Sequence, residues 1–423
     1  MTAATSYRIL NETLLPSLLG EVPSVARVLG GLPEDWRIRE VGDGNLNLVF
    51  LVEGPKGGVC AKQALPYVRA AGAGWPMKPV RAWFEQRCMR IQAPFAAGRT
   101  PDLYHYDPDL FLTVMEMLQP HTIMRWGMIN AVCYPRFVEH ITDYMARTLF
   151  LTSDLALAAA EKKAVVADFC GNSEMCKITE DLIFTDPYML CDRNRWTTPQ
   201  LDGIAAEFRT DGALKRAISD LKLKFLSDAQ ALLHGDLHTG SVMVTEDDSR
   251  VIDTEFAFCG PMGFDVGTVV GNLLINYHAQ DGHARPNDPR ADYQRWVLDT
   301  VAGVWSGFAE KFAALWETDR TGDAYPRSLF EDAGDVDALR SARDAYVSAL
   351  YRDSLGFAGA EMIRRILGFA HNIDLDWIED PDLRALCETR CLRLARAMLV
   401  EPERFETIGV LTAEAERLRA TVG

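Results

Sequence analysis

The chain has 423 residues, with 48% hydrophobic and 25% charged residues, a composition that is ordinary for a globular enzyme of two lobes or domains. Its 60 acidic and 44 basic residues give a formal net charge of −16. This acidic balance argues against nucleic acid and against anionic membrane surfaces as partners.

The sequence shows no signal for export or membrane insertion. No run of about 20 apolar residues is present, and the first residues lack the basic and then apolar order of a secretion signal. The nine cysteines are scattered and include no Cys-x-x-Cys pair. Free thiols in a reducing compartment are the expected state, so we predict a cytoplasmic protein.

A glycine-rich hairpin is expected near the N-terminus. The strand predicted at 36–41 runs into the segment 42–53, whose tip holds two glycines and two asparagines: Gly42, Gly44, Asn45 and Asn47. Glycine and asparagine tolerate φ > 0 and add little bulk, so backbone amides at such a tip can approach an anion closely. We predict that the tip covers the phosphates of ATP; a plain β-turn is the alternative.

Lys62 lies within an apolar strand expected at 58–64. A buried amine is costly unless it is paired, so this position predicts a phosphate or carboxylate partner. The candidate carboxylate is Glu85, on a helix expected at 80–89. A glycine hairpin, a strand lysine and a helical glutamate follow one another as in the amino lobe of a kinase. The alternatives are a solvated amine for Lys62 and an exposed acid for Glu85.

The segment 67–79 is long and rich in glycine, which predicts a loop able to close over a substrate. Trp75 on this loop would shield the reaction from water, or would anchor the loop on its lobe. A strand expected at 110–118 closes the lobe, and the backbone of Glu116 and Met117 would face the adenine edge.

The link between the lobes is expected just before Pro120. We therefore divide the chain into an amino-terminal nucleotide-binding lobe, 1–118, and a carboxy-terminal catalytic and substrate-binding lobe, 119–423. The pattern of the second lobe is mainly helical.

Two acids flank a short hairpin predicted at 242–252, namely Asp236 before it and Asp253 after it. Because hairpin strands are antiparallel, both acids lie at the same end. Phosphoryl transfer needs one carboxylate to receive the proton of the attacking hydroxyl and another to hold Mg²⁺ against the phosphates. We assign Asp236 to the first role and Asp253 to the second.

Two later features complete the set of candidates. Asp265 precedes an apolar helix and could cap it; the position resembles that of an acid which steadies the catalytic loop in kinase-like folds. Arg364 and Arg365 are adjacent on a helix expected at 360–370, where neighbours point about 100° apart. At least one of them must therefore leave the apolar stripe and find an anion or water. A salt bridge to a local acid is the simpler interpretation.

These segments together resemble the 5-methylthioribose kinases of methionine salvage over nearly the whole chain. The segments that carry the resemblance are Gly-Asp-Gly-Asn-Leu-Asn-Leu-Val-Phe at 42–50, Lys-Gln-Ala-Leu-Pro-Tyr-Val at 62–68, His-Gly-Asp-Leu-His-Thr-Gly-Ser at 234–241, the segment 255–265 and the arginine pair. They are more specific than the motifs shared with aminoglycoside phosphotransferases and choline kinases.

The resemblance implies an α+β, protein-kinase-like fold of two lobes, with an antiparallel sheet in the amino lobe and a mainly helical carboxy lobe. It implies ATP-dependent phosphorylation of the C1 hydroxyl of 5-methylthioribose and a homodimer. It also implies that Asp253 and Glu255 bind Mg²⁺, and that Arg364 and Arg365 serve the substrate and the transferring phosphoryl group.

The chain departs from related patterns at two positions. Thr254 stands where members of the family commonly have proline, and both flanking acids are intact. Ser241 stands where protein kinases and aminoglycoside phosphotransferases have a metal-binding asparagine, so we expect Glu255 to make the second metal contact.

Two other functions remain open from the sequence. A kinase of the same fold could act on an amino alcohol or an aminoglycoside, whose positive charge needs an acidic or aromatic site. A non-catalytic nucleotide-binding module would be expected to have lost an essential residue, yet Lys62, Asp236, Asp253 and Glu255 are all present.

Overall fold

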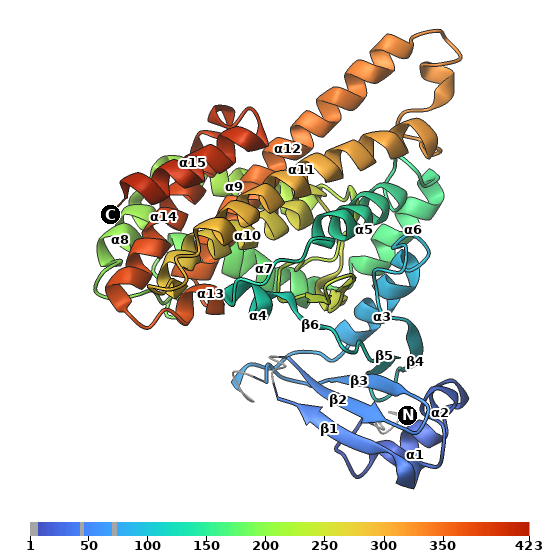
Figure 1. Ribbon diagram of the computed structural model, residues 1–423. Coiled ribbons are helices and arrows are strands. Elements are labelled where there is room, and N and C mark those ends of the chain that lie inside the picture. The colour runs from blue at the N-terminus through green and yellow to red at the C-terminus, as the bar shows by residue number, and fades with distance from the viewer. Residues whose placement is uncertain (1–6, 43–45, 70–73, 423) are drawn as a thin grey trace.

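The computed structural model describes residues 7–42, 46–69 and 74–422. An N-terminal part is built on one antiparallel sheet, and a larger C-terminal part is mostly helical (Figure 1). The predicted α+β class, with the sheet in the amino lobe and helices in the carboxy lobe, is confirmed. Within the described residues, no helix is long and apolar enough to cross a membrane.

The N-terminal sheet has five strands in the order β1-β2-β3-β5-β4. Alternate side chains of β2, β3 and β5 form one buried face that packs with α1 and α2: Phe50, Val52, Val59, Ala61, Leu112 and Val114. Because successive residues of a strand point to opposite faces, Lys62 is turned away from this core and toward the C-terminal part. The elements are α1 Leu15–Gly20, α2 Pro23–Leu29, η1 Pro33–Asp35, β1 Arg37–Val41, β2 Asn47–Glu53, β3 Gly58–Ala64, α3 Arg81–Gln92, β4 Leu103–Asp107 and β5 Leu112–Glu116.

The C-terminal part is a stack of helices around two small sheets (Figure 1). Its helices are α4 Met124–Ile129, α5 Phe137–Leu151, α6 Ala159–Phe169, α7 Ser173–Phe184, α8 Asp202–Thr210, α9 Gly212–Ser227, α10 Gly263–His283, α11 Ala291–Thr318, α12 Val336–Leu367, α13 Ile373–Asp376, α14 Pro381–Val400 and α15 Ile408–Thr421. Its strands and short 3₁₀ helices are β6 Thr122–Ile123, β7 Ala231–Leu232, β8 Val242–Val244, β9 Ser249–Val251, β10 Cys259–Gly260, η3 Asp186–Tyr188, η4 Thr254–Phe256, η5 Arg327–Leu329 and η6 Pro402–Arg404.

The predicted hairpin is present as β8 and β9, which pair antiparallel with Val242 opposite Val251. Asp236 precedes β8 and Asp253 follows β9, so both acids are at the same end, as expected. The strand that leads to Asp236 is separate: β7 pairs with β10, with Leu232 opposite Cys259.

Helices α10 and α12 pack so closely that their backbones nearly touch. Three glycines of α10, four residues apart and therefore on one face, lie against α12: Gly263, Gly267 and Gly271. A Cβ atom built on Gly267 would lie 2.5 Å from the carbonyl oxygen of Ser354, a distance that real Cβ atoms do not adopt. These glycines therefore set the position of α12, whose last turn carries Arg364 and Arg365.

We predict that Gly267→Val destabilises the protein by about 2 kcal/mol or more, because the added side chain must push α12 away from α10. Urea unfolding followed by circular dichroism measures the change. As a control, Gly203→Ala on α8 places its Cβ where nothing lies within 4 Å, and should leave stability equal or slightly higher. Equal unfolding midpoints for Gly267→Val and the unmodified chain would contradict this packing argument.

Candidate active site

The loop that carries Asp236 is held by a buried acid from α10. One carboxylate oxygen of Asp265 accepts the backbone N–H of His234 at 2.7 Å, and the other accepts that of Gly235 at 3.0 Å. Gly235 has φ +85°, and a Cβ atom there would lie 2.1 Å from the carbonyl oxygen of Phe256. The loop thus needs glycine at 235, and Asp265 steadies it as the sequence suggested.

The carboxylate of Asp236 faces three nitrogen-bearing side chains. Nη2 of Arg364 lies 3.1 Å and Nη2 of Arg365 lies 3.7 Å from Oδ1, while Nε2 of His238 lies 3.4 Å from Oδ2. Burial alone would raise the pKa of Asp236, but His238 and the two arginines hold it well below its ordinary value. Asp236 is therefore an ionised carboxylate near neutral pH.

Glu361 joins the two arginines from one turn earlier on α12. Its side chain accepts from Nε of Arg364 at 2.6 Å and from Nε of Arg365 at 2.7 Å. All three side chains are buried. The simpler interpretation of the arginines is thus right in part, because both pair with a local acid, yet both also reach Asp236. The i, i+3 and i, i+4 spacing of Glu361 was the available signal in the sequence.

Lys62 pairs with two acids from different parts of the chain. Its Nζ lies 2.8 Å from Oε1 of Glu85 and also contacts Oδ1 of Asp253. Burial opposes the charge of this amine, but Asp253 and Glu85 raise its pKa well above the ordinary value. The predicted pairing of Lys62 with Glu85 is present, and the amine reaches an acid of the other lobe.

Asp253 and Glu255 follow β9 on a tight turn. Asp253 has φ +72°, and its side chain remains 45% exposed. Glu255 is buried, and its Oε2 accepts from Nδ2 of Asn47 at 2.9 Å and lies 3.2 Å from Nε of Arg81. Burial raises the pKa of Glu255, and Asp253 raises it further.

These two acids fit a magnesium ion. Mg²⁺ is commonly held by one or two carboxylates together with substrate phosphates, and a cation beside Asp253 and Glu255 would offset the burial and the repulsion by Asp253 that raise the pKa of Glu255. Within the ranges that the structure describes, no group of three or more His, Cys, Asp or Glu side chains could hold a metal by itself. Ser241 instead donates its hydroxyl to the backbone carbonyl of Asp236 at 3.0 Å.

Arg81 is a site residue that sequence reasoning missed. It is 1% exposed, and its guanidinium donates to the carbonyl of Leu46 at 2.7 Å and to Oδ1 of Asn47 at 2.9 Å, besides its contact with Glu255. It thus ties the start of β2 to the turn that carries Glu255. Its partner Glu255 lies more than 170 residues away in the sequence, so no local pattern revealed this contact.

The remaining nucleotide candidates are less completely defined. Gly44 and Asn45 lie outside the described residues, whereas Gly42 is exposed and Asn47 is buried on β2. The backbone N–H of Glu116 donates to Asp102 at 2.8 Å. The N–H of Glu116 is thus already used, so a hydrogen-bond donor to an adenine would have to come from another residue.

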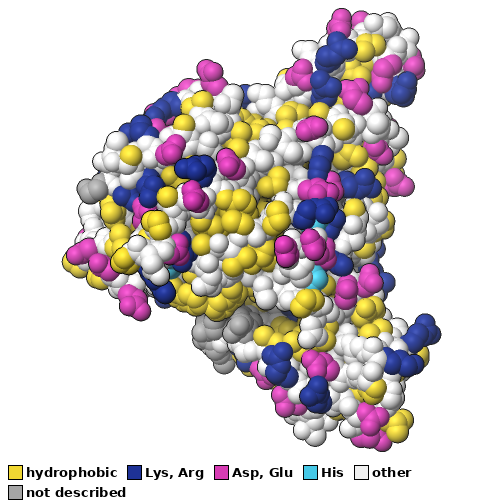
Figure 2. Space-filling model, in the orientation of Figure 1, with side chains coloured by type: hydrophobic (Ala, Val, Ile, Leu, Met, Phe, Trp, Pro, Cys, Tyr) yellow, Lys and Arg dark blue, Asp and Glu magenta, His cyan; other side chains and the backbone are white. Residues whose placement is uncertain are grey.

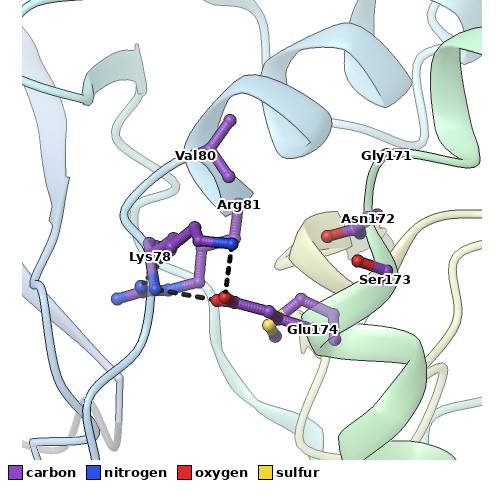
Figure 3. Close-up of a pocket in the computed structure, with 8 residues that line it drawn as sticks. Lys78, Val80, Arg81, Gly171, Asn172, Ser173 and Glu174 are labelled. Atoms are coloured by element: carbon purple, nitrogen blue, oxygen red, sulfur yellow. Dashed lines mark hydrogen bonds and ion pairs between the residues drawn. The ribbon is translucent and has the colours of Figure 1, made fainter.

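Trp75 lies against the C-terminal part. Its ring centroid is 5.7 Å from that of Phe369, just beyond α12, and Arg193 lies 6.0 Å over its face. The same segment is tied to α7 by Lys78, whose backbone N–H and Nζ each lie 2.9 Å from a carboxylate oxygen of Glu174 (Figure 3). The cavity beside this contact is only ≈40 Å³, too small for a sugar or a nucleotide.

The acidic chain gathers buried cations around this site. The visible surface carries both signs of charge interspersed (Figure 2), whereas five basic side chains at the site are at most 9% exposed: Lys62, Arg81, Arg125, Arg364 and Arg365. Nε of Arg125 donates to the hydroxyl of Thr239 at 3.0 Å, three residues after Asp236. A net charge of −16 is thus compatible with binding a polyphosphate.

Comparison with known proteins defines the class first. A model of the phosphotransferase enzyme family matches residues 37–310, and the chain belongs to that family. Methylthioribose kinase 1 of Oryza sativa subsp. japonica is 46% identical over 406 residues, which are 95% of this chain and 94% of that protein. Methylthioribose kinase of Escherichia coli O45:K1 is 44% identical over 414 residues, which are 97% and 98% of the two chains.

The chain is accordingly a member of the methylthioribose kinase family, and it is an ATP-dependent kinase. Among solved structures, the ethanolamine kinase of Plasmodium vivax aligns over 93% of each chain with 13% identity and a TM-score of 0.46.

We predict an acid-sensitive contribution to stability from Glu361. The arginines lower its pKa from 4.5 to about 2 against the effect of burial, a difference that corresponds to about 3 kcal/mol. Because the folded pKa is depressed, this stability is present above about pH 4.5 and is lost as the pH falls toward 2. Glu361→Gln should therefore be less stable at pH 7 by about 3 kcal/mol.

Urea unfolding between pH 7 and pH 3 measures both effects. The variant should lose part of the slope of stability against pH that the unmodified chain shows below pH 5. Glu139→Gln, which breaks an exposed pair with Arg136, is the matched control and should unfold like the unmodified chain. A full acid slope in Glu361→Gln would contradict the prediction.

Proposed function

We propose that the protein transfers the γ-phosphoryl group of ATP to the C1 hydroxyl of 5-methylthioribose, giving 5-methylthioribose 1-phosphate in methionine salvage. The observation that carries the proposal is the meeting of the ionised Asp236 with Arg364 and Arg365. This arrangement would supply a proton acceptor beside cations that stabilise the phosphoryl group during its transfer. The names of the relatives supply the substrate.

Asp236 would orient the acceptor hydroxyl and receive its proton. A carboxylate with a depressed pKa is a weak base, so positioning contributes most of the catalysis. The anomeric hydroxyl of a sugar suits this arrangement, because a hemiacetal is a stronger acid than an ordinary alcohol.

Arg365 is prepared for the substrate or for the transferring phosphoryl group. Its Nη2 is buried and has no hydrogen-bond partner among the described residues. A buried donor without a partner is costly, and an oxygen of the sugar or of the phosphoryl group would satisfy it. Arg364, which already donates to Asp236 at 3.1 Å, would support the same group.

The nucleotide would lie between the N-terminal sheet and the metal loop. Lys62 would contact the α- and β-phosphates, with Glu85 holding the amine in place. The hairpin tip with Gly42, Gly44, Asn45 and Asn47 would cover the phosphates, while backbone groups of Glu116 and Met117 would face the adenine. Trp75 would shield the acceptor from water.

Asp253 and Glu255 would hold Mg²⁺, which supplies charge neutralisation at the phosphates when bound. Three further expectations accompany the proposal. The lobe boundary lies between residues 118 and 119, two protomers form a homodimer, and the protein works in the cytoplasm. The last agrees with nine free cysteines.

An amino-alcohol or aminoglycoside kinase is the main alternative. The acceptor in such an enzyme is a cation, which needs acidic or aromatic neighbours. Arg364 and Arg365 beside Asp236 would repel it, so the charge of the site favours a neutral sugar.

The substrate is tested by coupled ATP turnover with 5-methylthioribose, ribose and choline. We expect 5-methylthioribose to be used with the highest kcat/KM, and ³¹P NMR to place the product phosphate on C1. The 5-substituent is discriminated by apolar shape, which is worth about 1–3 kcal/mol, so ribose should be about 10- to 150-fold worse. Preferred use of choline would overturn the proposal.

Asp236→Ala should lower kcat about 10³-fold or more, because the hydroxyl loses the group that orients and deprotonates it. ATP affinity, measured by calorimetry, should stay within a few-fold. Asp168→Ala, which removes a half-exposed partner of Arg87, is the control and should keep full turnover. Sustained turnover in Asp236→Ala would remove this residue from the mechanism.

A further inference from the structure

His238 is the third neighbour of Asp236, and the proposed reaction assigns it no role. It follows Asp236 by two residues on the catalytic loop, and its side chain is 15% exposed. One ring nitrogen, Nε2, faces Oδ2 of Asp236 at 3.4 Å. The other, Nδ1, faces back into the loop. The imidazole therefore bridges the loop backbone and the carboxylate.

The loop fixes which ring nitrogen carries the proton. The backbone N–H of Gly240 donates to Nδ1 at 3.0 Å, so Nδ1 must be an acceptor. In a neutral imidazole the proton is then on Nε2, the nitrogen that faces Asp236. Burial lowers the pKa of His238 to about 4, which agrees with a neutral ring at physiological pH.

Gly240 leaves the space that this orientation requires. A Cβ atom built on Gly240 would lie 2.8 Å from Cε1 and 3.0 Å from Nδ1 of His238. Any larger residue would push the ring out of line. The histidine and the glycine thus act as one unit, which uses a backbone N–H to set the tautomer.

The two oxygens of Asp236 consequently have different surroundings. The arginines of α12 approach Oδ1, and the imidazole approaches Oδ2. Without the imidazole, only the arginines at Oδ1 would oppose rotation of the Asp236 carboxylate about its Cβ–Cγ bond. With it, a nitrogen lies within 4 Å of each oxygen of the carboxylate.

We propose that His238 is a positioning residue for phosphoryl transfer, and that its neutral imidazole donates from Nε2 to Oδ2 of Asp236 and so aims Oδ1 at the acceptor hydroxyl. Orientation of this kind matters because a small misplacement of a reacting group costs a large factor in rate. The inference rests on the proposed role of Asp236 as the group that receives the proton.

Three substitutions of His238 separate the effect of its hydrogen-bond donor from the effect of its ring shape. His238→Phe keeps a ring without a donor. His238→Gln can place an amide N–H where Nε2 was, whereas His238→Asn is one carbon shorter and cannot reach. We expect kcat to fall about 10- to 100-fold in the Phe and Asn variants, as for loss of one hydrogen bond to a charged group, and to stay within about fivefold in the Gln variant.

The split between kinetic constants distinguishes positioning from folding. KM for ATP should stay within about twofold in all three variants, and urea unfolding checks that each is folded. His278→Phe, at a buried histidine on α10 whose ring nitrogens lack partners within the described part of the chain, is the matched control and should keep kcat.

Two results would overturn the inference. One is a folded Phe or Asn variant with kcat within twofold of the unmodified chain, and the other is a Gln variant as slow as the Asn variant. Failure of the underlying proposal would be recognised by a different result, because turnover would then be retained in Asp236→Ala.

Discussion

Opposite charges link the two parts of this protein at the site. Lys62 comes from the N-terminal sheet, and its acid partner Asp253 comes from the turn after β9, 191 residues away in the sequence. Arg81 of α3 and Glu255, two residues after Asp253, form a second ion pair between the two parts. Because Arg81 and Glu255 are both buried, removing either one leaves an uncompensated charge, so each lobe depends on the other for the state of its own charged groups. A cation or a triphosphate bound at these residues would have to replace their present partners, and its binding would then be coupled to the relative position of the lobes.

A second constraint acts from the helical side. The arginines near Asp236 are on the last turn of α12, and the position of that helix is set by glycines of α10, far from any reacting group. Helix α10 also carries Asp265, which holds the backbone before Asp236. One helix therefore positions both the carboxylate and the cations that face it, so their separation is a property of the packed core rather than of mobile loops.

The sequence was informative where a function depends on local order and spacing. Asp236 and Asp253 could be placed at one end of a hairpin because β8 and β9 are consecutive, and Lys62 could be paired with Glu85 because an amine in a buried strand needs an acid. Strand β4 was not predicted, since Leu103–Asp107 is half-buried throughout and shows no alternation. Arg81 and His238 were also missed. Their roles follow from contacts across the fold or from the tautomer that one backbone N–H imposes, and neither leaves a periodic pattern in the chain.

The charge around Asp236 bears on the kind of acceptor that the site can use. A carboxylate surrounded by two guanidinium groups and an imidazole N–H is a weaker base than a free one. It would remove a proton from an ordinary alcohol only late in the reaction. Phosphoryl transfer tolerates this, because its loose transition state places little demand on the nucleophile before the bond to the leaving group has weakened. In the proposed reaction, the same cations that weaken the base would also neutralise the phosphoryl group that approaches it. The positive charges thus lower the basicity of Asp236 while they would stabilise the transferring group. The loss of basicity matters least when the acceptor hydroxyl is itself acidic, as at the anomeric carbon of a sugar.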